Sequence, residues 1–440
     1  MRRAFVILAA NRHGVDVLDR IGGTAVCAKS FMKPGRVSMG AYRRDGASSL
    51  KAHDPPRSDR GGFSSLRQSG VITIDHLVTE AVATPVSASA HLPALDGLRA
   101  FASLFVFNVH AFGYCLVAFY GWADTETRGF PGWSFESLTV WLHRSLYGVD
   151  LFFVLSGFLM ARQFDFARAR PLDFLARRGL RILPAYVLAL LLAALARWWV
   201  DGSVFSVGNW LQNLVFLHGF LDLGISAINP VTWSMSYEVA FYLSIPLIAW
   251  GFTATHRDRW AHVVIAVFLL ALILSIGTPL SRLNGYGLLF LVGIAVARAP
   301  PQILDRRPLW IAAALAWLGF VVASKFVLVL NRELAYYPAS MLGSGGLLIL
   351  TIAYGQRHRH APGRILQWIG DRSYSLFLLH SIVVYLLGAA LGPTIKPLGP
   401  VTASLIFVPF ALMLSLIASD LSYRIAERPY FRKRESNRPQ

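Results

Sequence analysis

Arg99 and His110 lie in one apolar stretch that begins after Asp96-Gly97-Leu98 and is long enough to cross a lipid bilayer. An ionisable side chain inside such a stretch is costly to bury, so its presence indicates a functional site. At a helical rise of about 1.5 Å per residue, the His110 imidazole lies roughly 20 Å along the helix, whereas Arg99 lies at its mouth. A guanidinium at the membrane surface and a buried base on one helix indicate chemistry within the membrane.

Two carboxylates accompany this base in further apolar stretches, Asp150 in the second and Glu238 in the fourth. Counting along helices of alternating direction predicts that both lie at the depth of His110, in the outer half of the membrane. With the three residues in one layer, the imidazole could take a proton from a hydroxyl, while the carboxylates orient it and stabilise its charged form. The alternative is that each residue is a satisfied polar group inside a helix bundle.

A basic segment follows the second apolar stretch and contains Arg178 and Arg181, which share a face if the segment is helical. Guanidinium groups bind phosphates through paired hydrogen bonds, so these arginines could hold an anionic cofactor from the cytosol. The alternative, which also applies to Arg99, is a positively charged anchor at the lipid headgroups.

Weaker candidates lie near these residues. The run from Trp233 to Glu238 combines an interfacial indole with hydroxyls, as a sugar-binding entrance or as an aromatic belt followed by interhelical hydrogen bonds. Ser156-Gly157 favours close helix packing over a nucleophilic serine. The secondary site candidates are Ser234, Ser236, Tyr374 and His380.

The composition indicates an integral membrane protein. Of the 440 residues, 55% are hydrophobic and only 15% are charged, compared with about 25% in a soluble domain. The net charge of +18 comes from arginines between apolar stretches, so membrane topology explains it better than nucleic-acid binding does. The two cysteines make a disulfide framework or a cysteine metal site improbable, and no metal is expected.

The elements that must position these residues form an all-α, multi-pass membrane domain over 91–430. Before this domain, residues 1–90 are expected to form a disordered basic leader, and the same pattern would arise from a start codon assigned too far upstream. After it, residues 431–440 form a basic tail. Ten membrane-spanning helices are predicted, at about 97–119, 146–162, 181–199, 231–250, 261–277, 283–298, 309–329, 335–354, 373–390 and 401–423. The apolar piece 210–220 is too short to span.

The distribution of basic residues predicts the orientation of these helices. Placing the basic segment 162–181 in the cytoplasm puts the other arginine-rich loops on the same side, whereas the loop from about 200 to 231 has no Lys or Arg. An even number of spans with both termini in the cytoplasm satisfies every loop. We therefore expect a protein of the inner, cytoplasmic membrane.

Taken together, these stretches resemble the membrane acyltransferase-3 family, which O-acylates carbohydrates outside the cytoplasm. The resemblance covers about 93–430, and its motifs are specific only in combination. It is carried by Asp96-Gly97-Leu98-Arg99-Ala100, the Arg99 to His110 pair, Gly148 to Phe158, Arg178-x-x-Arg181 with Pro184, Trp233-Ser-Met-Ser-Tyr-Glu238, Ser373-Tyr374 with His380, and Glu427-Arg428-Pro429.

The resemblance implies that acetyl-CoA, or another acyl-CoA, is the donor and approaches from the cytoplasm. Carried over residue by residue, Arg99, Arg178 and Arg181 would hold its phosphates while the pantetheine arm reaches toward His110. We expect His110 to act as general base on a sugar hydroxyl, oriented by Asp150 or Glu238, with a covalent acyl-histidine relay as the competing route.

A proton-coupled transporter or exporter of a glycan or small molecule is the alternative function, because intramembrane His, Asp and Glu also form proton relays. It predicts internal symmetry, and the motif-bearing first four helices have no matching set later in the chain. The sequence leaves open the acceptor, with lipopolysaccharide O-antigen and exopolysaccharide among the possibilities, together with the acyl chain and the oligomeric state.

Overall fold

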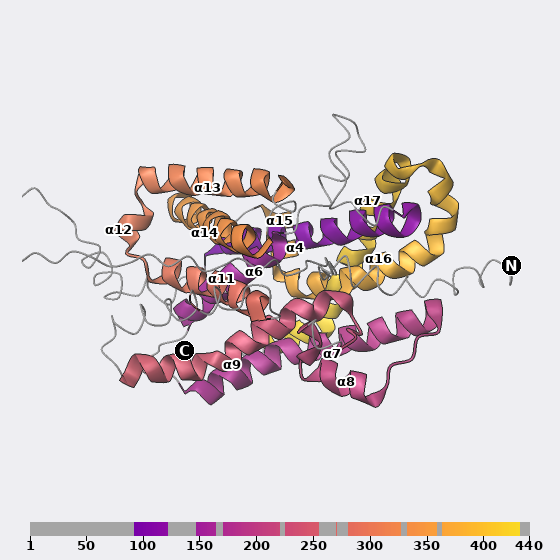
Figure 1. Cartoon of the computed structure of the whole chain (residues 1–440), viewed down its shortest axis with the longest axis horizontal. Helices are drawn as coiled ribbons and strands as arrows, with labels where there is room; N and C mark the ends of the chain where they lie inside the picture. Colours follow the sequence, from indigo (N-terminus) through magenta and orange to yellow (C-terminus); the bar gives the residue numbers. More distant parts are fainter. Residues whose placement is uncertain are drawn as a thin grey trace, which may run out of the picture.

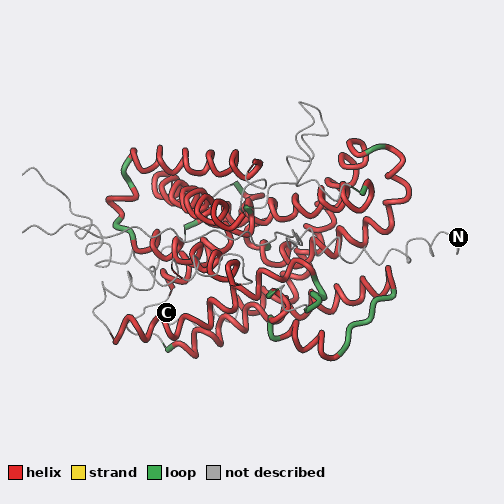
Figure 2. The backbone as a smooth tube through the Cα atoms, viewed as in Figure 1, coloured by secondary structure: helices red, strands yellow, loops and turns green. Residues whose placement is uncertain are grey.

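The computed structural model describes residues 92–121, 147–163, 170–220, 225–254, 270, 280–326, 332–358 and 363–431. Throughout these ranges the regular structure is helical, and no strand occurs (Figure 2). The leader 1–90, the predicted span 261–277 apart from residue 270, and the tail from 432 onward lie outside the described residues. Within the described part of the chain, the predicted all-α class is confirmed.

The helices run mostly along the long dimension of the molecule (Figure 1). Their bounds are α4 Pro93–Tyr114, η1 Cys115–Phe119, α6 Gly148–Gln163, α7 Pro171–Asp201, α8 Val207–Leu214, η2 Leu217–Gly219, η4 Pro230–Thr232, α9 Trp233–Ala254, α11 Leu280–Arg298, α12 Pro301–Leu304, α13 Arg307–Phe326, α14 Arg332–His358, α15 Arg364–Asp371, α16 Ser373–Ile395, η6 Lys396–Leu398, α17 Pro400–Ser422 and η7 Tyr423–Glu427.

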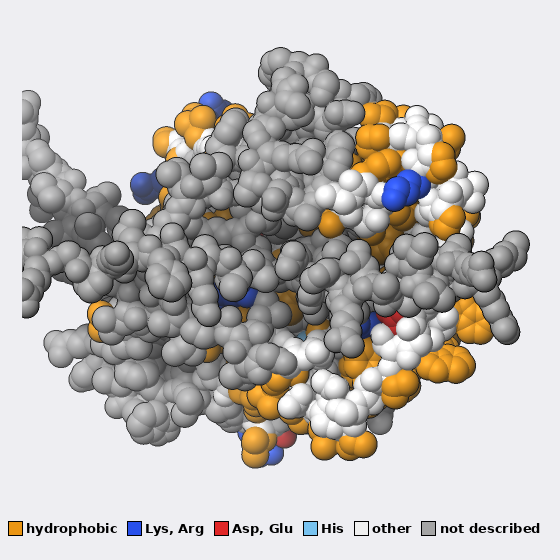
Figure 3. Space-filling model, turned by 45° about the vertical axis from the view of Figure 1, so that its right-hand side comes forward, with side chains coloured by type: hydrophobic (Ala, Val, Ile, Leu, Met, Phe, Trp, Pro, Cys, Tyr) orange, Lys and Arg blue, Asp and Glu red, His pale blue; other side chains and the backbone are white. Residues whose placement is uncertain are grey.

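Five helical stretches are long and apolar enough to cross a membrane: Pro93–Phe119, Leu172–Asp201, Tyr336–His358, Ser373–Leu398 and Pro400–Phe431. Large apolar side chains of α7, α13 and α17 are exposed, among them Leu195, Leu315 and Leu421. Hydrophobic side chains also gather on the visible described surface (Figure 3). Because a soluble protein rarely exposes apolar surface on this scale, these faces are suited to contact lipid.

Helix α4 packs in parallel with α16. His110 meets His380, and the Cβ of any residue replacing Gly388 or Gly392 would lie 2.0 Å from Tyr114 or 2.8 Å from Phe119. The matched order of these contacts sets α4 and α16 side by side over several turns (Figure 1). The apolar stretch that carries His110 is therefore buried against a second membrane-length helix.

Helices α6 and α11 approach each other through two glycines. A Cβ at Gly157 would lie 2.1 Å from the carbonyl oxygen of Phe290, and a Cβ at Gly293 would lie 2.0 Å from that of Val154. Neither distance is possible for a real side chain, so both positions require glycine. The predicted packing role of Gly157 is confirmed, because small residues let helix backbones approach closely in membranes.

Helix α7 begins ten residues before the predicted span at 181–199. It starts at Pro171, contains Pro184 and continues to Asp201, where Gly202 ends it with a left-handed φ of 73°. The basic segment before the predicted span is therefore helical, which is the condition under which Arg178 and Arg181 share a face. Arginine and leucine are good helix formers, so the basic turns extend the apolar helix without a break, and Arg178 and Arg181 are held by the same helix that enters the apolar layer.

The connection between α7 and α9 contains regular helical structure and is held by specific hydrogen bonds. Helix α8 begins after Ser206, whose hydroxyl accepts a hydrogen bond from the Asn209 backbone N–H, and η2 follows it. Asn213 holds the segment that returns to α9, because its Oδ1 accepts from Ile228 N and its Nδ2 donates to Ser226 O. The piece 210–220 thus forms a short helix and a turn, in agreement with its being too short to span.

Candidate active site

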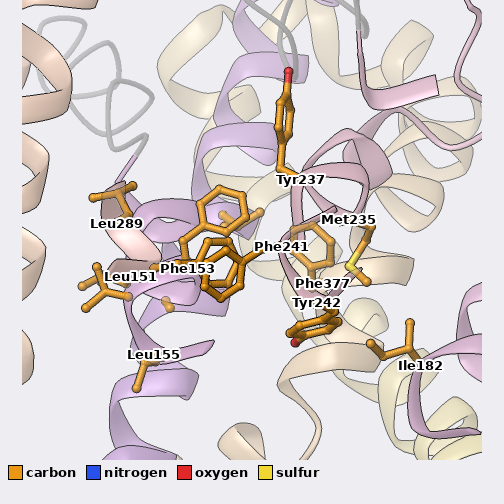
Figure 4. Close-up of a cluster of buried hydrophobic side chains, with 14 of the residues drawn as sticks. Leu151, Phe153, Leu155, Ile182, Met235, Tyr237, Phe241, Tyr242, Leu289 and Phe377 are labelled. Carbon is orange, nitrogen blue, oxygen red and sulfur yellow. The ribbon is translucent and has the colours of Figure 1, made fainter. Parts of the chain in front are cut away.

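A pocket lies between α4, α6, α7, α9 and α16. It contains three arginines at one part of its wall, a carboxylate, several hydroxyls and a set of aromatic and aliphatic side chains. Figure 4 shows part of the apolar packing around it, with Phe153, Met235, Tyr242, Ile182 and Phe377 converging from different helices. The lining residues are Arg99, Val149, Phe152, Phe153, Leu155, Ser156, Leu159, Arg178, Arg181, Ile182, Ser234, Met235, Glu238, Tyr242, Ser373, Tyr374 and Phe377.

Arg99, Arg178 and Arg181 meet at this pocket although Arg99 is separated from the other two by about eighty residues of sequence. They lie within electrostatic reach of one another. The Arg178 guanidinium lies 5.5 Å from the ring centre of Phe174 and 5.4 Å from that of Tyr242, and Arg181 lies 5.6 Å from that of Phe431. Cation–π contacts of this kind hold guanidinium groups in place. The predicted grouping of these arginines is present.

Asp96, Glu238 and Glu427 are among the acidic side chains that balance the arginines. Asp96 Oδ1 lies 3.5 Å from Arg99 NH1, Glu238 interacts electrostatically with Arg178, and Glu427 interacts with Arg181 and Arg99. Glu427 is 2% exposed, and its Oε1 lies 2.5 Å from the Ser375 hydroxyl. Like charges repel strongly in a dry interior, so these carboxylates allow the arginines to stay grouped before any anion binds.

His110 and His380 form a buried pair. Each donates a hydrogen bond from Nδ1 to the carbonyl four residues earlier, His110 to Val106 at 2.8 Å and His380 to Leu376 at 3.0 Å. Because a carbonyl only accepts, both Nδ1 atoms carry hydrogen and, in the neutral rings, both Nε2 atoms carry a lone pair. His380 Nε2 lies 3.2 Å from His110 Nδ1 and also accepts from it. This leaves His110 Nε2 as the basic nitrogen.

The histidine pair lies beyond the pocket along α4 and α16. His110 lies eleven positions after Arg99, which is about three helical turns or 16 Å, and the two lie within about 20° on the same face of the helix. Phe377 lines the pocket, and its ring centre lies 6.2 Å from that of His380, one turn further along α16. A chain that extends from the arginines past Phe377 would therefore reach the histidine pair.

The expectation that Asp150 and Glu238 lie at the depth of His110 was wrong. A Cβ at Gly148 would contact Ala102 O and Val106, so α6 begins a turn short of His110 and Asp150 lies further still. Asp150 Oδ2 accepts hydrogen bonds from Tyr336 at 2.5 Å and Ser340 at 2.7 Å. The depth count assumed that each apolar stretch starts at the same membrane surface, and these helices start at different heights.

Glu238 lies in the pocket and not at His110. Its Oε1 accepts hydrogen bonds from the Ser156 and Tyr242 hydroxyls. Neither Glu238 nor Asp150 therefore hydrogen-bonds to the imidazole, and the orienting contact comes from His380. The catalytic roles of His110, Asp150 and Glu238 stay predictions.

The secondary candidates separate into three kinds. Ser234 and Tyr374 line the pocket, and Tyr374 also donates to Ile182 O at 3.1 Å, which ties α16 to α7. Ser236 accepts from Gly219 N at 3.0 Å and so anchors the connection between α7 and α9. His380 is the direct partner of His110.

Sequence reasoning did not find Asn229 and Ser381, two polar residues near the histidine pair. Asn229 donates from Nδ2 to Leu378 O at 2.8 Å and accepts at Oδ1 from Ser381 at 2.9 Å, which fixes α16 on both sides of His380. Asn229 lies just before Pro230 in a loop, where such a residue ordinarily signals a turn. No local pattern reveals a partner about 150 residues away.

The described helices combine membrane-length apolar faces, an arginine-lined pocket and a buried histidine pair on α4 and α16. This arrangement fits a membrane-embedded transferase. The family model described as "Acyltransferase domain" matches residues 92–424, and the chain belongs to the acyltransferase-3 family.

Curated relatives share this region. They include O-acetyltransferase OatA of Staphylococcus aureus strain NCTC 8325, which is 25% identical over 389 residues covering 78% of this chain and 58% of the relative. Another, provisionally named peptidoglycan O-acetyltransferase YrhL of Bacillus subtilis strain 168, is 26% identical over 384 residues, covering 77% of this chain and 55% of the relative. The matched region is thus somewhat over half the length of these relatives. No solved structure matches the chain.

Proposed function

We propose that the protein transfers an acetyl group, or another acyl group, from acyl-CoA to a hydroxyl of an extracytoplasmic carbohydrate. The observation that carries the proposal is the pocket in which Arg99, Arg178 and Arg181 meet, because Arg99 lies on the face of α4 that also carries His110. The relatives' names support O-acetyl transfer and a polysaccharide acceptor, for which lipopolysaccharide O-antigen and exopolysaccharide are our candidates.

In this proposal the arginines hold the phosphates of the donor. Guanidinium groups form strong, charge-assisted hydrogen bonds to phosphate oxygens, and rings already hold two of the three arginines here. The pantetheine arm extends past Phe377 toward His110. The phosphates replace part of the negative charge that Asp96, Glu238 and Glu427 supply in the empty pocket.

The transfer itself uses His110 as general base. Nε2 takes the proton of the acceptor hydroxyl while that oxygen attacks the thioester carbonyl carbon, and a tetrahedral oxyanion forms. The oxyanion collapses, the C–S bond breaks, and the leaving thiolate takes the proton back from the imidazolium to give free CoA thiol and the ester. In the competing route, Nε2 attacks the thioester carbon and the C–S bond breaks to release the CoA thiolate. The resulting acyl-imidazolium passes the acyl group to the acceptor hydroxyl, whose proton goes to the thiolate.

The membrane setting of this reaction follows from the same assignment. We propose that the chain resides in the inner membrane with ten spans and both termini in the cytoplasm, so that the arginine end of α7 faces the cytosol. The histidine pair then faces the outer half of the membrane, where a carbohydrate acceptor meets it.

Proteoliposomes test the proposal. Radiolabelled acetyl-CoA is supplied on the arginine side, and label on glycan is compared among wild type, His110→Ala and Arg178→Lys. We expect His110→Ala to lose transfer by at least 10²-fold, because general-base catalysis contributes about that much. Arg178→Lys is expected to raise the KM for acetyl-CoA, because a lysine is a poor substitute at a bidentate phosphate site.

Arg177→Lys is the matched control. It makes the same change on the adjacent residue, which is exposed and lies outside the pocket. Full transfer by a folded His110→Ala variant would overturn the catalytic assignment, and equal KM values for the two lysine variants would overturn the donor site.

A further inference from the structure

A cluster of aromatic rings stands next to the pocket at the outer ends of α6 and α9. Its members, called the aromatic cluster here, are Trp233, Tyr237, Tyr286, Tyr336 and Tyr337. Ring centres in three of its contacts are 5.9 Å apart for Trp233–Tyr237, 5.5 Å for Trp233–Tyr286 and 5.1 Å for Tyr237–Tyr286. Tyr337 lies 5.5 Å from Tyr286 and 5.8 Å from Tyr336, which extends the cluster onto α14.

The aromatic cluster adjoins the pocket wall through one neighbour in sequence and one ring contact. Trp233 precedes the pocket residue Ser234, and the ring of the pocket residue Phe153 lies 4.7 Å from that of Tyr286. Tyr237 points away from the packed side chains of Met235 and Tyr242 (Figure 4). The cluster therefore flanks the pocket but is not part of the arginine end.

Asp150 supplies a carboxylate to this cluster. Both of its hydrogen bonds, from Tyr336 and Ser340, end on Oδ2, which leaves Oδ1 to accept another. Within the described part of the chain, the indole N–H of Trp233 and the hydroxyl of Tyr286 form no hydrogen bond. The cluster thus combines ring surfaces with one acceptor and two donors that are open to a ligand.

This combination fits a sugar ring. The apolar faces of pyranoses stack on aromatic rings, and their hydroxyls bond to carboxylates, hydroxyls and indole N–H groups. Asp150 disfavours an anionic ligand, because two like charges in a buried site repel. A belt of aromatic residues at the lipid interface is a poorer explanation, since Tyr237 is 3% exposed, Tyr337 6% and Asp150 2%.

We propose that the aromatic cluster and Asp150 form the acceptor site and bind an uncharged pyranose of the glycan, with a sugar hydroxyl donating to Asp150 Oδ1. The inference rests on the proposed function and gives Asp150 a role in binding the acceptor, in place of orienting His110. The pocket then receives the donor at the arginines and the acceptor at the outer ends of α6 and α9.

The test uses the full chain in nanodiscs, with radiolabelled acetyl-CoA as donor and two uncharged probes, chitotetraose and maltotetraose. Asp150→Asn keeps the shape of the side chain, and Tyr286→Phe removes only the hydroxyl. We expect each to raise the KM for the better glycan at least tenfold while the KM for acetyl-CoA stays within twofold. Tyr354→Phe, an exposed tyrosine near the far end of α14, is the matched control and should change neither constant.

Two results would overturn the inference. One is an unchanged glycan KM in both variants, and the other is wild-type protein that neither binds nor acetylates either glycan. The proposed function is read separately, from acetyl-CoA binding that Arg178→Lys weakens when no glycan is present. Loss of that signal in wild type would overturn the function as well, whereas its presence alone would overturn only the acceptor site.

Discussion

His380 holds His110 in one neutral form, because both Nδ1 atoms donate to backbone carbonyls and His380 Nε2 accepts from His110 Nδ1. A base that must take a proton at Nε2 needs its hydrogen kept at Nδ1. We therefore assign His380 the role of a positioning residue. Substitutions of a positioning residue change the pH dependence of kcat, whereas substitutions of a purely structural residue do not.

We expect His380→Leu to lower kcat by on the order of 10²-fold and leave the KM for acetyl-CoA unchanged, because a leucine accepts no hydrogen bond. His380→Gln should recover much of the loss, since its amide oxygen accepts from His110. The measurement is a pH profile of kcat for both variants, in which the acidic limb, set by the pKa of the His110 base, moves only for leucine. Equal loss with unmoved profiles in both would assign His380 to packing alone.

His218 makes a second residue-scale prediction. Its Nε2 donates to Thr232 Oγ1 at 2.9 Å, because the Thr232 hydroxyl itself donates to Asn229 O at 2.7 Å. Burial in the connection between α7 and α9 lowers the pKa of His218 from 6.5 to about 4. Between these values the unfolded chain binds a proton that the folded chain does not, so stability falls as the pH falls from about 6.5 to 4, by up to about 1.4 kcal/mol per pH unit.

Thermal unfolding in nanodiscs, followed from pH 7.5 down to pH 4, checks this. His218→Gln keeps an N–H for Thr232 and removes the titration, so its melting temperature should fall less steeply below about pH 6.5. Parallel curves for wild type and variant would show that the acid sensitivity arises elsewhere.

At the scale of elements, the contact between α6 and α11 is the most constrained. Gly157 and Gly293 let the two backbones touch, and α6 carries Asp150 and Ser156 into the site. We expect Gly157→Val to destabilise the fold by more than about 3 kcal/mol or to prevent folding, because its side chain would overlap the Phe290 carbonyl.

Gly319→Ala is the control for this prediction. Gly319 also lies in a helix, but nothing stands within 4 Å of the Cβ it lacks. The added methyl group should leave stability equal or raise it slightly, since alanine favours the helix. Yield and melting temperature in detergent measure both variants, and equal behaviour would refute tight packing between α6 and α11.

For the whole molecule, the distribution of arginines predicts which ends of the helices share a side. Val204 follows the end of α7 and is exposed, and Gln302 lies in α12 beside the basic residues that follow α11. In a background carrying Cys27→Ser, a membrane-impermeant maleimide added to intact cells should label Val204→Cys and not Gln302→Cys. The buried Cys115 should stay unlabelled. Labelling of Gln302→Cys alone would invert the topology.

Much of the fold could be predicted because its signals are local. Apolar stretches predict helices wherever they occur, and nine of the ten predicted spans correspond to helices of the described part of the chain. The earlier start of α7 has the same origin, since hydropathy marks where a helix enters the apolar layer and not where its hydrogen bonding begins. The grouping of the arginines followed from their motif spacing and from family resemblance.

The sequence by itself determined that the chain is an apolar helical protein, which residues carry charge within it and which helix carries Arg99 and His110, because composition and helical rise are properties of short segments. The tertiary structure alone decided which of these residues meet. His110 pairs with His380, which lies 270 positions later in the chain. Asp150 accepts hydrogen bonds from Tyr336 and Ser340, which lie 186 and 190 positions later. Such contacts depend on the relative heights and rotations of packed helices, and backbone approaches at glycines set these.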